Sequence, residues 1–272
     1  MNNRIIKLSL CLILILSSVA VFAKGKQITC SGSTTVLPVA QATAEAFMDA
    51  NPEINISVRG GGSGVGVAAL QNKTVDIANS SRPMKSKEIS QCKSKGINPT
   101  AYSIANDGIS MVVHKNNGIK NLSVAQIRDI YTGKVKNWKD LGGANMPIVV
   151  ISRDVASGTY EVFNEKALSG AKVDPSAQLL ASNNAVVSSV STTPGAIGYA
   201  GLGYVNESVR VVTVNGIMPN EVTVKDSSYP LSRKLYMYTN GKASGDVARY
   251  ISFIQSNAGQ EIVKKQGFIS LN

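Results

Sequence analysis

The sequence has few of the residues that build metal centres and catalytic sites. Its 272 residues include one histidine, one tryptophan and three cysteines. No cysteine or histidine stands at the spacing of a zinc site, so we expect no metal and no cofactor. A nucleophilic serine needs a neighbouring base, and His114 lies in an apolar strand-like run where packing explains it. An enzyme that uses Ser157 as nucleophile is therefore the weaker alternative, and we predict no catalytic residues.

Signatures of nucleotide and nucleic-acid binding are also missing. The Gly-x-x-x-x-Gly-Lys-Ser/Thr loop does not occur in the sequence. The chain is basic, with a formal net charge of +11, but its lysines are scattered and aromatic residues make up only 6%. No basic run reaches the length of a nucleic-acid patch. We expect a soluble cationic surface and no nucleic-acid partner.

Long apolar segments are confined to the start of the chain. Residues 1–23 have the pattern of a secretory signal peptide, with basic residues, an apolar core over 8–16 and Val21-Phe22-Ala23 as the cleavage site. The core is shorter than the roughly 20 residues that span a membrane, which favours cleavage over a retained anchor. Lys24 follows the site where a lipoprotein would have cysteine. We expect a periplasmic protein whose mature chain begins at Lys24.

Removal of the signal would leave two cysteines, Cys30 and Cys92. An even pair in an oxidising compartment is a disulfide candidate. The sequence does not show whether their Cβ atoms face each other, so a disulfide and two thiols are both open.

Glycine, serine and threonine gather in four turns that each join a strand-like run to a helix-like run. These turns are Ser31–Val39, Gly60–Val67, Asn79–Pro83 and Ser152–Thr159. The alternation of strands and helices predicts an α/β fold with a largely parallel sheet. Ligands bind at the carboxyl ends of the strands in such sheets, so the repeated turns predict one shared binding site. Farther along, Val209–Val214 and Glu221–Val224 are predicted as strands joined by Asn215-Gly216.

The turn at 152–159 favours an oxyanion as the ligand. Arg153 supplies a fixed positive charge and a fork of donors. Ser157 and Thr159 are good N-cap residues, and Gly158 allows a ligand to approach the main chain. An anion would then lie at a helix N-terminus. For this turn alone, an ordinary capped turn with a surface arginine is an equal alternative.

Seven segments together resemble a known family over nearly the whole mature chain. They are Gly-Ser-Thr-Thr-Val at 32–36, Arg-Gly-Gly-Gly-Ser-Gly at 59–64, Asn-Ser-Ser-Arg-Pro-Met at 79–84, Asn-Asp-Gly at 106–108, Gly-Lys-Val-Lys-Asn-Trp-Lys-Asp-Leu-Gly-Gly at 133–143, Ser-Arg-Asp-x-x-Ser-Gly-Thr at 152–159 and Gly-Ala-Ile-Gly-Tyr at 195–199. In this order they resemble the phosphate-binding subunit of Pst-type ABC transporters. The resemblance implies a two-lobe periplasmic binding protein, each lobe a central mixed sheet flanked by helices.

The resemblance also implies where the lobes divide. Lobe 1 would comprise 24–108 and 233–272, and lobe 2 would comprise 109–232. Two crossing strands, near 109–114 and 233–238, would join them.

Carried over residue by residue, the resemblance implies a ligand site formed by both lobes. The predicted phosphate-binding residues are Thr34, Thr35, Ser63, Ser81, Asp107, Arg153, Ser157, Gly158 and Thr159. Asp107 would accept the proton that phosphate keeps near neutral pH and would repel fully deprotonated sulfate. A helix cap or an arginine salt bridge is the alternative role for Asp107. Arg82 could face the anion or brace Asp107, and a ligand contact of Ser33 is open.

The expected function is high-affinity binding of inorganic phosphate and its delivery to the permease subunits of an ABC importer in the inner membrane, by a monomer. A receptor for sulfate or molybdate and an exported adhesin are the alternatives.

Overall fold

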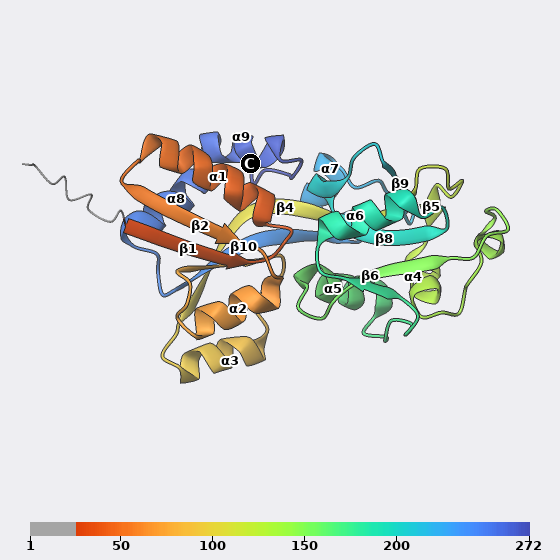
Figure 1. Ribbon diagram of the computed structural model, residues 1–272, viewed down its shortest axis with the longest axis horizontal. Coiled ribbons are helices and arrows are strands. Elements are labelled where there is room, and N and C mark those ends of the chain that lie inside the picture. The colour runs from red at the N-terminus through yellow and green to blue at the C-terminus, as the bar shows by residue number, and fades with distance from the viewer. Residues whose placement is uncertain (1–25) are drawn as a thin grey trace, which may run out of the picture.

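Alternating strands and helices form an elongated α/β molecule with two lobes (Figure 1). This computed structural model describes residues 26–272. The predicted signal peptide and its cleavage site lie outside the described residues. The two-lobe α/β fold predicted from the sequence is confirmed. Within residues 26–272, no helix combines the length and the apolarity that a membrane crossing requires.

The first lobe contains the two ends of the described chain. Its strands are β1 (Lys26–Gly32), β2 (Ile54–Arg59), β3 (Ile77–Ser80), the first part of β4 (Pro99–His114) and β10 (Ser232–Asn240), and its helices are α1 (Leu37–Ala50), α2 (Ser63–Gln71), α3 (Ser86–Ser94), α8 (Gly245–Gln255) and α9 (Asn257–Lys265). Helices α1, α8 and α9 cover one face of the sheet, and α2 and α3 cover the other (Figure 1).

The second lobe repeats this layered arrangement. Its strands are the rest of β4, β5 (Asn121–Leu122), β6 (Val149–Arg153), β7 (Gln178–Leu180), β8 (Ala196–Gly201) and β9 (Val209–Val214), and its helices are α4 (Val124–Tyr131), α5 (Gly158–Phe163), α6 (Asn183–Thr192) and α7 (Glu221–Lys225), with short turns η1 (Trp138–Leu141), η2 (Asn164–Leu168) and η3 (Leu202–Tyr204). Helix α6 packs on one face, while α4, α5 and the buried Trp138 pack on the other.

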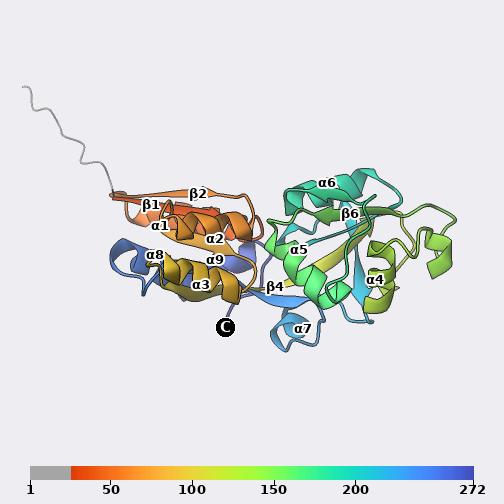
Figure 2. The same cartoon turned by 90° about the horizontal axis from the view of Figure 1, so that it is seen from below.

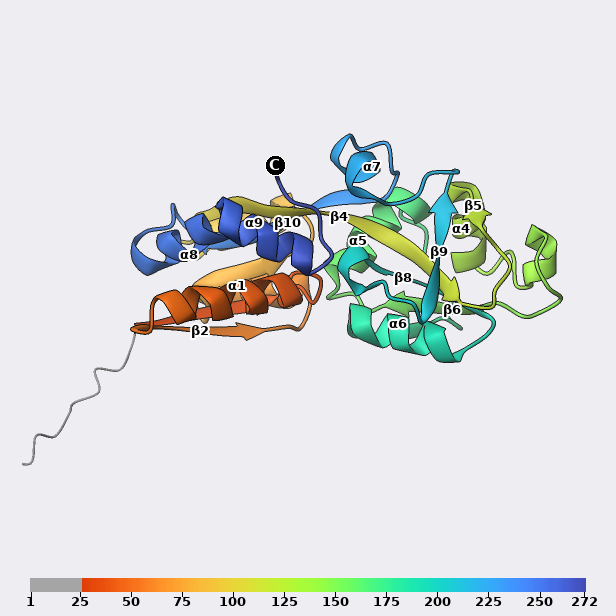
Figure 3. The ribbon, with the colours of Figure 1, turned by 90° about the horizontal axis from the view of Figure 1, so that it is seen from above.

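A single mixed sheet runs through both lobes in the order β2-β1-β3-β10-β4-β8-β6-β7. The parallel pairs lie toward its two ends, and β10 and β4 run antiparallel at its middle. Strand β4 pairs with β10 up to Gly108, with β8 from Ile109 onward and with β9 from Met111 onward (Figure 3). Its second half is buried throughout, which suits a strand covered on both faces. The lobe boundaries at 108/109 and 232/233 remain a prediction, and this change of partner agrees with them.

One predicted strand is wrong. Residues 221–224 form helix α7, because the Asn220 side chain accepts a hydrogen bond from the Thr223 N–H at 3.0 Å and caps a helix. The alternation of Val222 and Val224 resembled a strand, but Val222 is 69% exposed. The preceding turn at Asn215-Gly216 is present, with both residues at positive φ.

The positions of the two cysteines relative to the sheet show whether they form a disulfide. Cys30 and Cys92 are both buried thiols with no disulfide. Cys30 packs in the core under α1, whereas Cys92 packs in the separate core between the sheet and α2 and α3. Because the sheet lies between these two cores, a disulfide does not form.

Candidate functional site

The predicted binding turns meet where the two lobes touch. Thr34 and Thr35 follow β1, Ser63 begins α2, Ser81 follows β3, and the arginine turn joins β6 to α5. Helices α2 and α5 begin opposite each other across the junction (Figure 2). All the predicted site residues are buried, although nearly all are polar. We call them, together with Asn183 and Arg233 described below, the interlobe site.

The lobes are in direct contact at this site. The Gly64 N–H donates to the Ala156 carbonyl at 3.0 Å, and the hydroxyls of Thr35 and Thr159 lie 2.9 Å apart. Gly158 lies so close to the first lobe that a Cβ there would stand 2.2 Å from Ser63 Oγ. Glycine at 158 is therefore required for the lobes to approach this closely.

The helix starts are locally well formed. The Ser157 hydroxyl accepts a hydrogen bond from the Tyr160 N–H at 3.2 Å and caps α5. In the first turn, the Ser33 hydroxyl accepts from the N–H groups of Thr35 at 3.1 Å and Val36 at 3.3 Å. Ser33 therefore holds the turn that carries Thr34 and Thr35.

The Thr34 hydroxyl accepts two hydrogen bonds from its neighbours, which leaves it only the role of a donor toward a further group. Its hydroxyl oxygen accepts from Arg153 Nη2 and from Asn183 Nδ2, both at 3.2 Å. A hydroxyl has two acceptor sites and one donor hydrogen. With both acceptor sites used, the Thr34 hydroxyl has its hydrogen left for another group.

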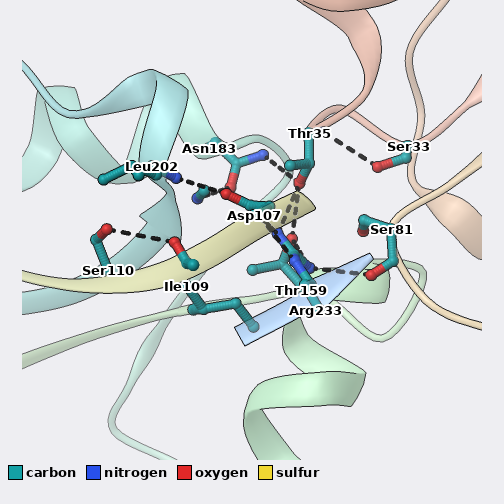
Figure 4. Close-up of polar contacts among 12 residues, drawn as sticks. Ser33, Thr35, Ser81, Asp107, Ile109, Ser110, Thr159, Asn183, Leu202 and Arg233 are labelled. Carbon is teal, nitrogen blue, oxygen red and sulfur yellow. Dashed lines mark hydrogen bonds and ion pairs between the residues drawn. The ribbon is translucent and has the colours of Figure 1, made fainter. Parts of the chain in front are cut away.

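The same count of accepted and donated hydrogen bonds applies to the hydroxyls of Thr35 and Thr159 (Figure 4). Thr35 Oγ1 accepts from Asn183 Nδ2 at 3.0 Å and from Arg233 Nη2 at 3.2 Å, so it must donate to Thr159. Thr159 Oγ1 accepts that bond and another from Arg233 Nη1 at 3.0 Å. The hydrogen of Thr159 is thus also left for another acceptor.

Arg153 brings a positive charge with an unused donor. Its Nε and Nη2 donate to the carbonyls of Leu180 and Ala181, both at 2.9 Å, which fixes the guanidinium. Its Nη1 is buried and has no hydrogen-bond partner within residues 26–272. Burial lowers the pKa of Arg153, which marks a cation that a bound anion would stabilise.

Asp107 is held by an arginine, as its alternative role suggested. Arg233 donates to Asp107 Oδ2 through Nε at 2.8 Å, its Nη2 lies 2.7 Å from the same oxygen in an ion pair, and both side chains are buried. Burial lowers the pKa of Arg233, although the negative charge of Asp107 and its hydrogen bond act to raise it. The other oxygen, Oδ1, accepts only from the Leu202 N–H, at 2.8 Å, among the described residues. Asp107 Oδ1 therefore has a lone pair left, and its partner Arg233 also donates to Thr35 and Thr159.

Asn183 and Arg233 were not predicted from the sequence. Asn183 Oδ1 accepts from the Gly201 N–H at 3.1 Å, which fixes the amide so that its NH₂ group faces Thr34 and Thr35. Asn183 lies next to the capping Ser182 and has the pattern of a helix start. The sequence predicts only that Arg233 begins a crossing strand. It stands between Ser232 and Lys234, and no local pattern distinguishes it from the neighbouring lysine.

Arg82 takes neither of its two predicted roles. It forms ion pairs with Glu88 at 2.6 Å and with Glu161 at 2.7 Å, whereas Asp107 is braced by Arg233. Within residues 26–272, no group of three or more His, Cys, Asp or Glu side chains could hold a metal.

The chain matches known proteins over most of its length. Residues 20–258 match the PBP superfamily domain. The chain is 34% identical over 258 residues to the phosphate-binding protein PstS of Bacillus subtilis (strain 168), covering 91% of this chain and 83% of that protein.

Solved structures give the same assignment. The structure of a phosphate ABC transporter substrate-binding protein with bound phosphate from Clostridium perfringens superposes with a TM-score of 0.84 at 36% identity, covering 91% of this chain and all (100%) of the other. An ABC-type phosphate transport receptor from Vibrio cholerae has a TM-score of 0.74 at 28% identity, covering 89% and 99% of the two chains. The chain therefore belongs to the PBP superfamily and, within it, to the family of the PstS phosphate-binding proteins.

Proposed function

We propose that the protein binds one inorganic phosphate ion in the interlobe site and delivers it to an ABC importer. The observation that carries this proposal is the orientation of the donors. The hydroxyls of Thr34 and Thr159 each have both acceptor sites used, and Arg153 Nη1 is buried without a partner. Preorganised donors from two lobes suit a ligand that is negatively charged and rich in acceptors. The PstS relatives support phosphate as that ligand.

Asp107 supports phosphate over sulfate. Near neutral pH phosphate keeps at least one proton, whereas sulfate has none to donate. The lone pair left on Asp107 Oδ1 can accept the phosphate proton. Beside sulfate, the carboxylate would be an unmatched negative charge. A sulfate or molybdate receptor is therefore the weaker proposal.

Binding would be coupled to closure of the two lobes. Thr34, Thr35, Ser63 and Ser81 come from the first lobe, and the arginine turn comes from the second. An anion bound by both groups stabilises the form in which the lobes touch. We place the lobes at 24–108 with 233–272 and at 109–232, in agreement with the change of partners along β4.

We also propose that the protein binds without catalysing a reaction. The Ser157 hydroxyl is occupied as a helix cap, and the Nδ1 of His114 accepts from the Asn116 N–H at 3.2 Å. The pattern of residues 1–23 supports export to the periplasm. The expected partners are phosphate and the permease subunits, with no nucleic acid, and the expected state is a monomer.

Thermal unfolding in matched salt tests the proposal. Phosphate at 100 times its Kd stabilises a one-site receptor by about 2.7 kcal/mol, which corresponds to a Tm increase of about 5 to 10 °C. Arg153→Met should lose this gain. Arg249→Met, which removes a half-exposed surface arginine, should keep it. A wild-type Tm that phosphate does not raise above matched chloride would refute the proposed function.

A further inference from the structure

A second set of charges connects the lobes outside the interlobe site. Glu161 of α5 lies 2.7 Å from Arg82 Nε and 2.6 Å from Lys85 Nζ, both of the first lobe. We call Arg82, Lys85, Glu88 and Glu161 the rim cluster. The side chains of Arg82 and Glu161 are only 5% and 15% exposed, whereas Lys85 is 58% exposed. The Arg82–Glu161 pair is thus shielded enough to contribute more than an ordinary surface pair.

Arg82 is fixed by its own lobe before Glu161 is considered. Its Nη1 and Nη2 donate to the two oxygens of Glu88 at 2.8 and 2.6 Å, and Nη1 also donates to the Pro83 carbonyl at 2.9 Å. Glu88 in turn accepts from the Lys85 N–H at 2.8 Å. These bonds leave Nε without a hydrogen bond in its own lobe, and Nε forms an ion pair with Glu161 Oε2 at 2.7 Å across the junction.

The first-lobe members of the rim cluster have one positive charge that is not balanced within their own lobe. Burial alone would lower the pKa of Arg82, but Glu88 and Glu161 outweigh burial and raise it. Arg82 and Lys85 carry two positive charges, and Glu88 balances only one of them. Glu161 supplies the second negative charge when the lobes meet.

The position of Glu161 in the sequence ties this contact to the ligand. Glu161 lies two residues after Thr159, on the short helix α5 that also presents Gly158 to the first lobe. Movement of α5 away from the first lobe would separate Thr159 from Thr35 and Glu161 from Arg82 together. The two sets of contacts therefore form and break as one unit.

We propose that Glu161 sets the affinity for the bound anion: its ion pairs with Arg82 and Lys85 hold the lobes together and slow release of the ligand. This inference rests on the proposed function, because it names a residue that acts on the same ligand without touching it. Glu161 is a positioning residue in this role. A contact that stabilises only the closed form raises the affinity of any ligand that requires closure.

The negative charge of Glu161 allows two effects on the bound anion to be distinguished: contact between the lobes and direct repulsion of the anion. A negative charge near an anion site repels the anion, so its removal should tighten binding if only the field mattered. If Glu161 holds the lobes together, its removal should weaken binding. The two explanations predict opposite signs for Glu161→Gln.

The test compares Glu161→Gln with Glu221→Gln. Glu221 is an exposed carboxylate that pairs with Lys225 within α7 at 2.8 Å, so its variant removes the same charge without an interlobe contact. For Glu161→Gln we expect the phosphate Kd to rise at least about fivefold, mainly through faster dissociation in stopped-flow measurements. Lys85→Met should give a smaller increase, and Glu221→Gln should match the wild type.

Small-angle scattering without phosphate gives a second readout. The radius of gyration of ligand-free Glu161→Gln should exceed that of the wild type and of Glu221→Gln. A Glu161→Gln protein that binds phosphate as tightly as the wild type would overturn the inference while leaving the proposed function intact. If the wild type itself binds no phosphate, the proposed function fails, and an unchanged radius of gyration in Glu161→Gln overturns the inference separately.

Discussion

Replacement of Asp107 by asparagine tests the link between this carboxylate and anion choice. Asparagine has nearly the same shape and can still accept the hydrogen bond from the Leu202 N–H, which is 2.8 Å from Asp107 Oδ1. It removes the negative charge that lies 2.7 Å from Arg233 Nη2. The variant therefore changes one buried charge with little change in packing.

Two magnitudes follow from this geometry. The buried Arg233 loses its partner, and breaking a buried ion pair in this way costs about 3 to 5 kcal/mol of unfolding free energy. That cost corresponds to a Tm decrease of about 6 to 20 °C. Loss of a hydrogen bond between phosphate and a charged acceptor costs about 1.5 to 3 kcal/mol, or about 10- to 150-fold in phosphate affinity. Sulfate loses no such bond and is relieved of a repulsive charge.

Calorimetric titration with both anions at equal ionic strength measures the effect. The ratio of phosphate to sulfate affinity should fall at least about tenfold in Asp107→Asn. Asp226→Asn, which alters an exposed carboxylate at the end of α7, is the matched control. An affinity ratio that stays within twofold of the wild-type ratio would refute the role of Asp107 in selectivity.

Three further predictions concern contacts at and around the site. Gly158→Ala should weaken phosphate binding about 10- to 100-fold by titration, because its Cβ would stand 2.2 Å from a hydroxyl of the facing lobe; a Kd within threefold of the wild type would contradict this close approach. Cys30 and Cys92 should resist a thiol reagent in the native protein and both react after unfolding without reductant, since both are buried thiols and burial raises the pKa of Cys30; unreactive cysteines in the unfolded chain would indicate a disulfide. Burial raises the pKa of Glu88, but hydrogen bonds from Arg82 and a backbone N–H outweigh it and lower this pKa below the ordinary 4.5. Glu88 thus contributes stability that is present above about pH 4.5 and is lost as the pH falls through the lowered pKa, so Glu88→Gln should flatten the acid side of the stability profile in denaturant titrations, and an unchanged acid slope would contradict this.

The binding turns could be predicted because their signals are local. Arg153, Ser157 and Gly158 stand together in one short turn that starts a helix, so the sequence indicates them as a group even though Arg153 bonds to the distant Thr34. The same holds for the turn at Thr34 and Thr35. Within one lobe, such turns lie at the carboxyl ends of parallel strands, whereas the meeting of the arginine turn with the first-lobe turns depends on how the two lobes pack.

Asn183 and Arg233 could not be found in this way. Each acts on a threonine more than a hundred residues away, and its role depends on how the lobes meet. Arg82 shows the opposite error: it lies beside Ser81 in the sequence, yet its guanidinium turns to Glu88 and Glu161. Proximity in the chain predicted neither the direction of this side chain nor its partner.

The misassigned strand at 221–224 has a local cause. Alternating valines indicate a strand, while Asn220 indicates a helix start, and the cap decided the outcome. Whether the two cysteines form a disulfide depends on which face of the sheet each thiol occupies, and no local sequence pattern shows that.

In the proposed function, donors from both lobes bind phosphate and Asp107 selects it over sulfate. The most direct test is calorimetric titration of the mature protein, unfolded and refolded to remove bound anion, with phosphate and then sulfate at the same ionic strength. We expect tight one-to-one binding of phosphate and negligible heat with sulfate. Preference for sulfate, or no heat with either anion, would contradict it.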